Sequence, residues 1–169
     1  MLDIVTMGYI DDFDSQSLKT YKNNNGIFEL DQELPEISLN TCWFDFADLD
    51  NDNYVEMIAH GFNEEYENRI YIYNNTNGEF SLQTVIDGLD ALSTEAANSI
   101  AIADYNNDGY MDFIVTGSDD DYNDKTSIFK NNNGTFELVD EGLKQVGGSS
   151  SVAWIDYNND NNIDLISTI

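Results

Sequence analysis

The chain has 169 residues, of which 33 are acidic and 6 are basic, and its formal net charge at pH 7 is −27. That length suits one ordinary domain with a hydrophobic core, and a composition of 41% hydrophobic and 12% aromatic residues argues against disorder. The charge argues against nucleic acid or an anionic membrane as a partner, because the chain offers no cationic surface that would displace counterions. Cys42 is the only cysteine, which rules out an intramolecular disulfide, and no apolar run is long enough for membrane insertion.

In chain order, the same parts recur with steps of 56 and 52 residues. Each unit begins with a short strand in which large apolar side chains alternate with mainly small ones, and an acidic loop then leads into a second apolar strand. The first two complete units end this second strand at Gly61 and Gly117, and Gly8 stands at the same place near the N-terminus. The predicted first strands are 42–47, 99–103 and 151–155, and the predicted second strands are 55–60, 111–116 and 163–168.

A third and a fourth strand follow, joined in every unit by an Asn-Gly pair. The pairs are Asn25-Gly26, Asn77-Gly78 and Asn133-Gly134, each between alternating apolar segments. Asn-Gly in this setting is a strong hairpin signal, because both residues accept a positive φ. Four antiparallel strands in about fifty residues, repeated along the chain, predict an all-β fold made of β-propeller blades.

The loop between the first and second strands carries oxygen-bearing side chains at its first, third, fifth and ninth positions. Its clearest copy is 104–112, and the other two copies are 48–56 and 156–164. Such a loop suits a hard divalent cation, with Ca²⁺ the first choice because Mg²⁺ requires a stricter octahedron. The sixth position is Asn53, Gly109 or Asn161, and Asn and Gly are the residues that most readily adopt a left-handed backbone.

Two other interpretations of these loops are weighed against the metal site. The first is that they are solvated Asp/Asn turns in a very acidic chain, which the agreement at the sixth position disfavours. The second is an EF-hand, which needs a twelve-residue loop between two helices. We reject the EF-hand, because these loops close at the ninth residue and continue into segments rich in Val, Ile and Phe.

The residues that carry these features resemble the FG-GAP or VCBS repeat family, the calcium-loop blades also found in integrin α-subunit propellers. The resemblance covers nearly the whole chain and is most specific at Ala103–Gly117 (ADYNNDGYMDFIVTG) and Ser151–Ser167 (SVAWIDYNNDNNIDLIS). It implies a β-propeller with one Ca²⁺ in each complete loop, three in all. Glu56 stands where the closing residue is usually Asp. The implied ligands are Asp48, Asp50, Asp52, the Tyr54 carbonyl and Glu56; Asp104, Asn106, Asp108, the Tyr110 carbonyl and Asp112; and Asp156, Asn158, Asp160, the Asn162 carbonyl and Asp164.

The register of the repeats divides the chain into four parts. Asp3–Gly8 aligns with Asp112–Gly117, so we expect the chain to begin at a second strand. The expected parts are a partial blade at 1–40 (strands two to four), blades at 41–97 and 98–149, and a partial blade at 150–169 (strands one and two). Because a propeller needs at least four blades to close, we expect either a piece of a longer protein or a ring completed by self-association.

No catalytic constellation is found in this sequence. His60 is the only histidine and lies at the end of a predicted strand, and there is no Gly-rich phosphate loop. We therefore expect a non-enzymatic module that recognises an extracellular protein or a carbohydrate, as in cell adhesion. The alternative is an accessory propeller domain of a secreted polysaccharide-acting enzyme.

The binding surface is expected opposite the acidic loops, where each unit carries an aromatic residue among acids: Phe13, Tyr66 and Tyr122. These residues are interpreted either as a ligand platform or as anchors that hold their own loops against the sheet. Low-affinity calcium modules usually function outside cells, so we expect a secreted or cell-surface protein. The N-terminal sequence lacks the form of a signal peptide, and we therefore expect a longer chain.

Overall fold

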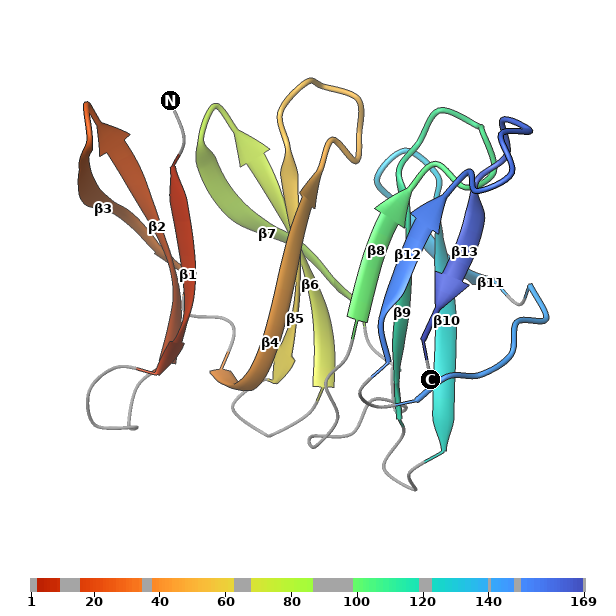
Figure 1. The fold of residues 1–169 in the computed structure, drawn as a ribbon. Coiled ribbons are helices and arrows are strands. Elements are labelled where there is room, and N and C mark those ends of the chain that lie inside the picture. Colours follow the sequence, from red (N-terminus) through yellow and green to blue (C-terminus); the bar gives the residue numbers. More distant parts are fainter. Residues whose placement is uncertain are drawn as a thin grey trace.

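The computed structural model describes residues 3–9, 16–34, 38–62, 68–86, 99–118, 123–139, 141–147 and 150–168. These residues form thirteen strands and no helix, arranged in four antiparallel sheets (Figure 1). The first sheet contains β1 (Ile4–Tyr9), β2 (Gln16–Asn24) and β3 (Ile27–Leu34). The second contains β4 (Ser38–Ala47), β5 (Glu56–Phe62), β6 (Asn68–Thr76) and β7 (Glu79–Ile86). The third contains β8 (Ser99–Ala103), β9 (Asp112–Ser118), β10 (Asp124–Asn131) and β11 (Phe136–Val139), and the fourth contains β12 (Val152–Ile155) and β13 (Asp164–Ser167).

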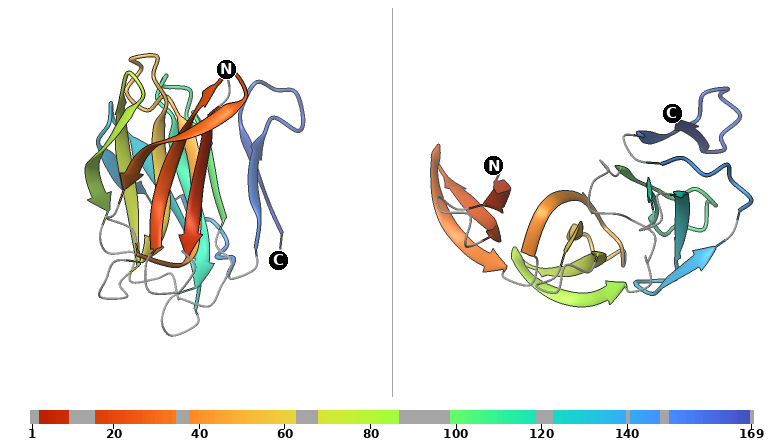
Figure 2. Two further views of the ribbon diagram at one scale, coloured as in Figure 1. Left: turned by 90° about the vertical axis from the view of Figure 1, so that its left-hand side faces the viewer. Right: turned by 90° about the horizontal axis from the view of Figure 1, so that it is seen from below.

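Each sheet is a meander in which strands consecutive in the chain pair with one another. The sheets stand side by side along an arc, as Figure 2 shows in the view from below. Neighbouring sheets meet through β1 and β4, β4 and β8, and β8 and β12. This arrangement is that of successive propeller blades, and it confirms the predicted all-β fold of partial-propeller type.

The hydrophobic core lies between the sheets. One cluster joins the second and third sheets and includes Leu49, Ile58 and Phe113, and the rings of Phe113 and Phe129 stack with centroids 4.7 Å apart. Met57, next to Ile58 on β5, points to the other face and packs against the first sheet. Because an inner strand of the second or third sheet has a neighbouring sheet on each face, these two sheets are stabilised chiefly by their neighbours, as in other repeat proteins.

The hairpin prediction is confirmed at all three Asn-Gly pairs. Asn25, Asn77 and Asn133 have φ values of 56°, 56° and 54°, and the glycines that follow have φ values of 93°, 93° and 84°. Positive φ at both central residues gives a turn whose twist matches that of the two strands. The glycine N–H of each turn also donates to an Asn side-chain oxygen three residues earlier, at 2.7 to 2.8 Å.

Some strand boundaries differ from the sequence-based expectation. The second strands continue one residue past Gly8, Gly61 and Gly117, because these glycines remain paired with the neighbouring strand. The first strand of the second sheet begins at Ser38, before the predicted unit boundary at residue 41. Neither difference moves an acidic loop relative to its strands.

Candidate metal centre

The three acidic loops occupy equivalent places in the fold. Each joins the first strand of its sheet to the second, at 48–56, 104–112 and 156–164. All three lie at the same end of the molecule, the upper end in Figure 1. The structure therefore places the predicted ligands of each loop in one local segment, at the tip of a strand pair.

Main-chain N–H groups hold the acidic side chains of each loop in place. In the first loop, Asp48 accepts hydrogen bonds from the N–H groups of Asp52 (3.1 Å) and Asn53 (3.0 Å), and Asp52 accepts one from Tyr54 (2.8 Å). The second and third loops repeat this pattern at 2.8 to 3.1 Å. These bonds occupy some lone pairs of each carboxylate and leave the others available to a ligand.

The loop backbone is left-handed at two positions, one of which was predicted. At the sixth position Asn53, Gly109 and Asn161 have φ values of 73°, 91° and 70°. The fourth position, which the sequence analysis missed, is also left-handed. Its signal was present, because Asn, the non-glycine residue that most often adopts this conformation, occupies it in all three loops. The fourth-position residues are Asn51 (63°), Asn107 (58°) and Asn159 (59°).

The closing carboxylates of the first two loops are buried and incompletely hydrogen-bonded. Glu56 is 1% exposed and Asp112 is fully buried. Glu56 Oε2 accepts the N–H of Leu49 at 2.7 Å, and Asp112 Oδ1 accepts the N–H of Asn131 at 2.8 Å. Their second oxygens, Glu56 Oε1 and Asp112 Oδ2, are buried and have no hydrogen-bond partner within the described part of the chain. A buried carboxylate oxygen without a partner is costly unless a cation satisfies it.

The protonation behaviour of these two groups has the same cause. The pKa of Asp112 is raised to about 6, chiefly by burial and also by the nearby Asp108 and Asp104, while the N–H groups of Asn131 and Tyr105 act to lower it. Burial likewise raises the pKa of Glu56. A positive charge beside either carboxyl group would therefore stabilise its ionised form.

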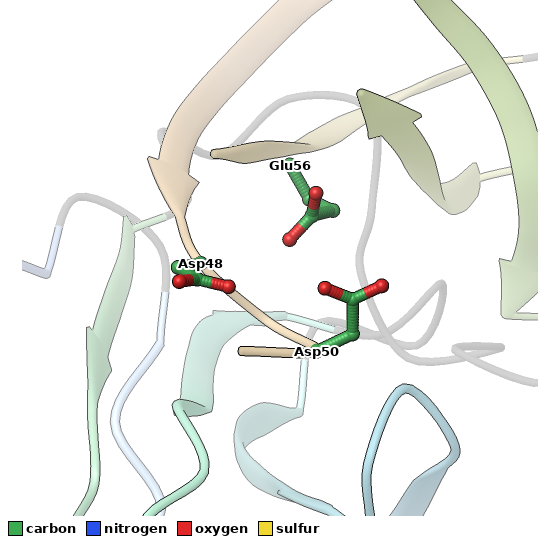
Figure 3. Close-up of side chains that lie close together, drawn as sticks. All are labelled: Asp48, Asp50 and Glu56. Atoms are coloured by element: carbon green, nitrogen blue, oxygen red, sulfur yellow. The ribbon is translucent and has the colours of Figure 1, made fainter. Parts of the chain in front are cut away.

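The oxygen atoms of the first loop have the spacing that a cation requires. Asp48, Asp50 and Glu56 each offer one carboxylate oxygen, and these atoms lie within 4.8 Å of one another. Figure 3 shows the three carboxyl groups converging from the loop after β4 and from the start of β5. Oxygen ligands at 2.3 to 2.6 Å from a Ca²⁺ ion lie at about this separation or closer. The donor set and its spacing fit a hard divalent cation.

The second and third loops differ in what surrounds them. In the second, Lys130 Nζ lies 3.2 Å from Asp108 Oδ2, a contact that the sequence analysis did not anticipate. In the third, the residues 157–162 are exposed, and Asp164 is half-buried and accepts the N–H of Tyr157 at 3.3 Å. The second site is therefore shared with an ammonium group, and the third is the most open of the three.

Asparagine side chains connect loops that belong to different sheets. Asn51 Nδ2 in the first loop donates to the carbonyl of Gly109 in the second loop at 3.0 Å. Asn131 Nδ2, at the end of β10, donates to the carbonyls of Leu49 (2.7 Å) and Met111 (3.0 Å). The first two loops are thus linked directly, which the sequence analysis missed. The repeated Asn-x-x-Gly sequence around the hairpins was the available signal for Asn131.

The predicted ligand platform lies outside the described residues, since Phe13, Tyr66 and Tyr122 all fall in undescribed segments. The described part of the chain contains no helix that could cross a membrane.

Comparison with known families agrees with these loops and sheets. The family of FG-GAP-like repeats matches residues 61–115 and 104–167, which together make up more than half of the chain. Comparison with curated proteins and with solved structures gave no match. Repeats of this family are typically extracellular, often bind calcium, and generally lack catalytic activity. The chain belongs to the FG-GAP-like repeat family.

Proposed function

We propose that this protein is a calcium-stabilised propeller module that recognises a protein or a carbohydrate outside the cell and has no catalytic activity of its own. The observation that carries the calcium assignment is the pair of buried carboxylate oxygens, Glu56 Oε1 and Asp112 Oδ2, which lack a partner in the described chain. Each lies in a loop whose other carboxylates are already held in place by main-chain N–H groups.

A bound Ca²⁺ ion would supply positive charge to carboxylates that otherwise repel one another. Three or four carboxylates gather in each nine-residue loop, and like charges about 4 Å apart repel by roughly 1 to 4 kcal/mol at surface-like dielectrics. The chain's own residues hold the loop in shape, and the N–H groups of Asp52, Asn53 and their equivalents orient the ligands. Adjacent sheets then stay in register, because Asn51 and Asn131 connect the first two loops.

Calcium titration of the chelator-treated protein tests this assignment. We expect isothermal titration to show binding at up to three sites, and the thermal melting temperature to fall in chelator and to recover in millimolar Ca²⁺. Asp112→Asn removes the charge of one closing ligand and should remove one site. Asp124→Asn, which changes an exposed carboxylate on β10, is the matched control. A melting curve that responds to neither chelator nor Ca²⁺ would rule the assignment out.

The recognition surface is proposed at Phe13, Tyr66 and Tyr122. The support is their recurrence among acidic residues in each unit. Aromatic rings can stack on sugars or peptide groups, and the neighbouring carboxylates can accept hydrogen bonds. The double variant Tyr66→Ala/Tyr122→Ala should keep the melting temperature and lose binding on a glycan or protein array. A lower melting temperature, with no ligand for the wild-type protein, would assign these residues to loop anchoring.

A further inference from the structure

A groove of about 460 Å³ opens between the first and second sheets. Its walls are mainly apolar, and its polar rim includes Asp3, Lys22 and Asn75. The apolar lining residues that matter here are Ile4, Val5 and Tyr21 from the first sheet and Phe44, Phe46 and Phe80 from the second. Two other junctions between sheets show what such a groove accommodates.

At each of those junctions, the second residue of an acidic loop packs against the next sheet. Leu49 is 1% exposed and lies in the cluster with Phe113 and Phe129 of the third sheet. Tyr105 stacks on Trp154 of the fourth sheet, with ring centroids 5.8 Å apart and an interplanar angle of 14°. The second residue of the loop therefore fills the junction in both cases.

An asparagine side chain accompanies this packing at the junction of the second and third sheets, and an equivalent asparagine lies at the groove. Asn131, beside Leu49, accepts the N–H of its hairpin glycine and donates to the carbonyls of Met111 and Leu49. Asn75, at the groove, likewise accepts the N–H of Gly78 and donates to the carbonyl of Val55, at 2.8 and 3.0 Å. Asn75 holds the place in the second sheet that Asn131 holds in the third. The carbonyl of the second residue of an acidic loop would therefore lie beside Asn75, as that of Leu49 lies beside Asn131.

The third acidic loop, at the other end of the arc, has an exposed residue at its second position. Tyr157 is the second residue of the third acidic loop, and it is 68% exposed. Ile155 on β12 and Ile166 on β13 are 46% and 49% exposed. The described structure thus has an apolar groove at one end of the arc, and at the other end the type of side chain that fills such grooves.

Asp3 and Lys22, at the groove, correspond in position to Asp112 and Lys130 at the second acidic loop. Asp3 Oδ1 accepts the N–H of Asn23 at 2.9 Å, as the closing ligand Asp112 accepts that of Asn131 at 2.8 Å. Lys22 precedes Asn23 as Lys130 precedes Asn131, and Lys130 contacts the fifth residue of its loop, Asp108. Lys22 is paired with Asp31 at 2.7 Å instead.

We propose that the groove binds the acidic loop of a second copy of this chain. In this dimer β12 of one copy pairs with β1 of the other, and the strands β12, β1, β2 and β3 form one four-stranded sheet across the two chains. Tyr157 then fills the groove beside Asn75, Asp160 faces Lys22, and Asp3 takes the closing position. β12 keeps its contacts with its own third sheet, where Trp154 Nε1 donates to the Ala101 carbonyl at 3.0 Å.

A second copy fits better than closure of one chain on itself. In two copies joined twice by this exchange, the described strands make six four-stranded sheets, within the four to eight blades that propellers use. The exchange requires β12 to leave β13. β13 and β1 compete for the same place in the joint sheet. β13 pairs with β12 over four residues, whereas β1 pairs with β2 over six, so β13 is the strand that is displaced. Each chain has a net charge of −27, and for this reason the dimer rests on the proposed calcium binding.

Light scattering coupled to gel filtration, on the 169-residue chain in millimolar Ca²⁺, tests the dimer. The expected mass is twice 19.1 kDa in Ca²⁺, falling to 19.1 kDa in chelator. Tyr157→Ser should weaken the dimer at least tenfold, and Lys22→Glu should also weaken it. Leu138→Ser removes another exposed apolar side chain, 60% exposed on β11 and outside the groove, and should leave the dimer unchanged.

A disulfide between copies tests the strand exchange itself. The register of β8 on β9 places Ala101 opposite Ile114, and the same register pairs Ala153 with Val5 of the other copy. Val5→Cys/Ala153→Cys, in a Cys42→Ser background, should give a covalent dimer in Ca²⁺, and neither single variant should do so. A disulfide within one chain, or a strict 19.1 kDa species that still binds Ca²⁺ in the titration, would overturn the dimer and leave the calcium assignment standing.

Discussion

Asn131 Nδ2 donates a hydrogen bond of 2.7 Å to the carbonyl oxygen of Leu49, a residue 82 positions earlier in the chain. The bond joins a hairpin of the third sheet to the acidic loop of the second. Both residues are buried, Asn131 completely and Leu49 to 1% exposure. The same amide group also bonds the Met111 carbonyl, so one side chain holds two acidic loops in a fixed relation.

Replacing Asn131 by alanine should destabilise the protein more than replacing Asn75, the equivalent asparagine of the second sheet. Asn131→Ala removes the donor to the carbonyls of the buried Leu49 and of Met111, and loss of the donor to a buried carbonyl costs about 1 to 3 kcal/mol. The matched variant is Asn75→Ala, because Asn75 makes the bonds to Val55 and Gly78 within its own sheet. We expect the free energy of unfolding in urea to fall by about 1 kcal/mol more for Asn131→Ala. Equal losses would show that the bond to Leu49 contributes nothing.

The glycine of the second loop provides a test of backbone conformation alone. Gly109 has φ of +91°, and a Cβ placed there would meet no atom within 4 Å. Gly109→Ala should therefore cost about 1 to 2 kcal/mol in the free energy of unfolding, owing to the left-handed conformation rather than to a clash. Gly109→Asn should cost less, because Asn53 and Asn161 occupy the equivalent positions. Urea unfolding of both variants in Ca²⁺ measures the difference, and a larger loss for Asn than for Ala would contradict it.

The local parts of the candidate site were predictable, and the contacts between sheets were not. Oxygen ligands at fixed spacing and Asn or Gly at the sixth position are properties of nine consecutive residues, and the fold of the hairpins follows from Asn-Gly in the same way. The bond from Asn131 to Leu49 depends on how closely two sheets approach, which no local pattern specifies. In the sequence, Asn131 is one of several asparagines before a turn glycine.

The ninth position illustrates the same limit. Glu56 departs from the usual Asp, and its longer side chain still brings one oxygen within 4.8 Å of oxygens of Asp48 and Asp50. The sequence predicted a ligand at this position but not its burial. Burial comes from the neighbouring sheets, and it raises the pKa of the carboxyl group. The most informative property of the site therefore arises from packing, not from the loop.

The calcium-free protein should gain stability as the pH falls from 7 to about 4. The folded-state pKa of Asp112 is about 6, chiefly because the group is buried, and an unfolded Asp has a pKa of about 3.9. Between these values the folded state binds more protons than the unfolded state, so the free energy of unfolding decreases as the pH rises. The effect is at most about 3 kcal/mol. Urea unfolding in chelator at several pH values measures it.

Asp112→Asn is the control for this pH dependence. The variant has no titrating group at that position, so the slope of its unfolding free energy between pH 4 and 6 should be smaller than that of the wild-type protein. In Ca²⁺, the wild-type slope should reverse, because the metal binds the ionised carboxylate and is displaced by protons. Identical slopes for the two chelated proteins would show that Asp112 does not carry the effect.

Lys130 should weaken calcium binding at the second loop. Its ammonium group lies 3.2 Å from Asp108 Oδ2, and this contact contributes to lowering the pKa of Asp108. A cation entering the loop must share Asp108 with that ammonium group or displace it. Lys130→Met should therefore raise the affinity of the second site, by up to about fivefold because the pair is about one-third exposed and such pairs are weak. Lys125→Met makes the same charge change at the other end of β10 and serves as the control. Isothermal titration with Ca²⁺ compares the two variants, and if both raise the affinity equally, the effect comes from net charge and not from the contact with Asp108.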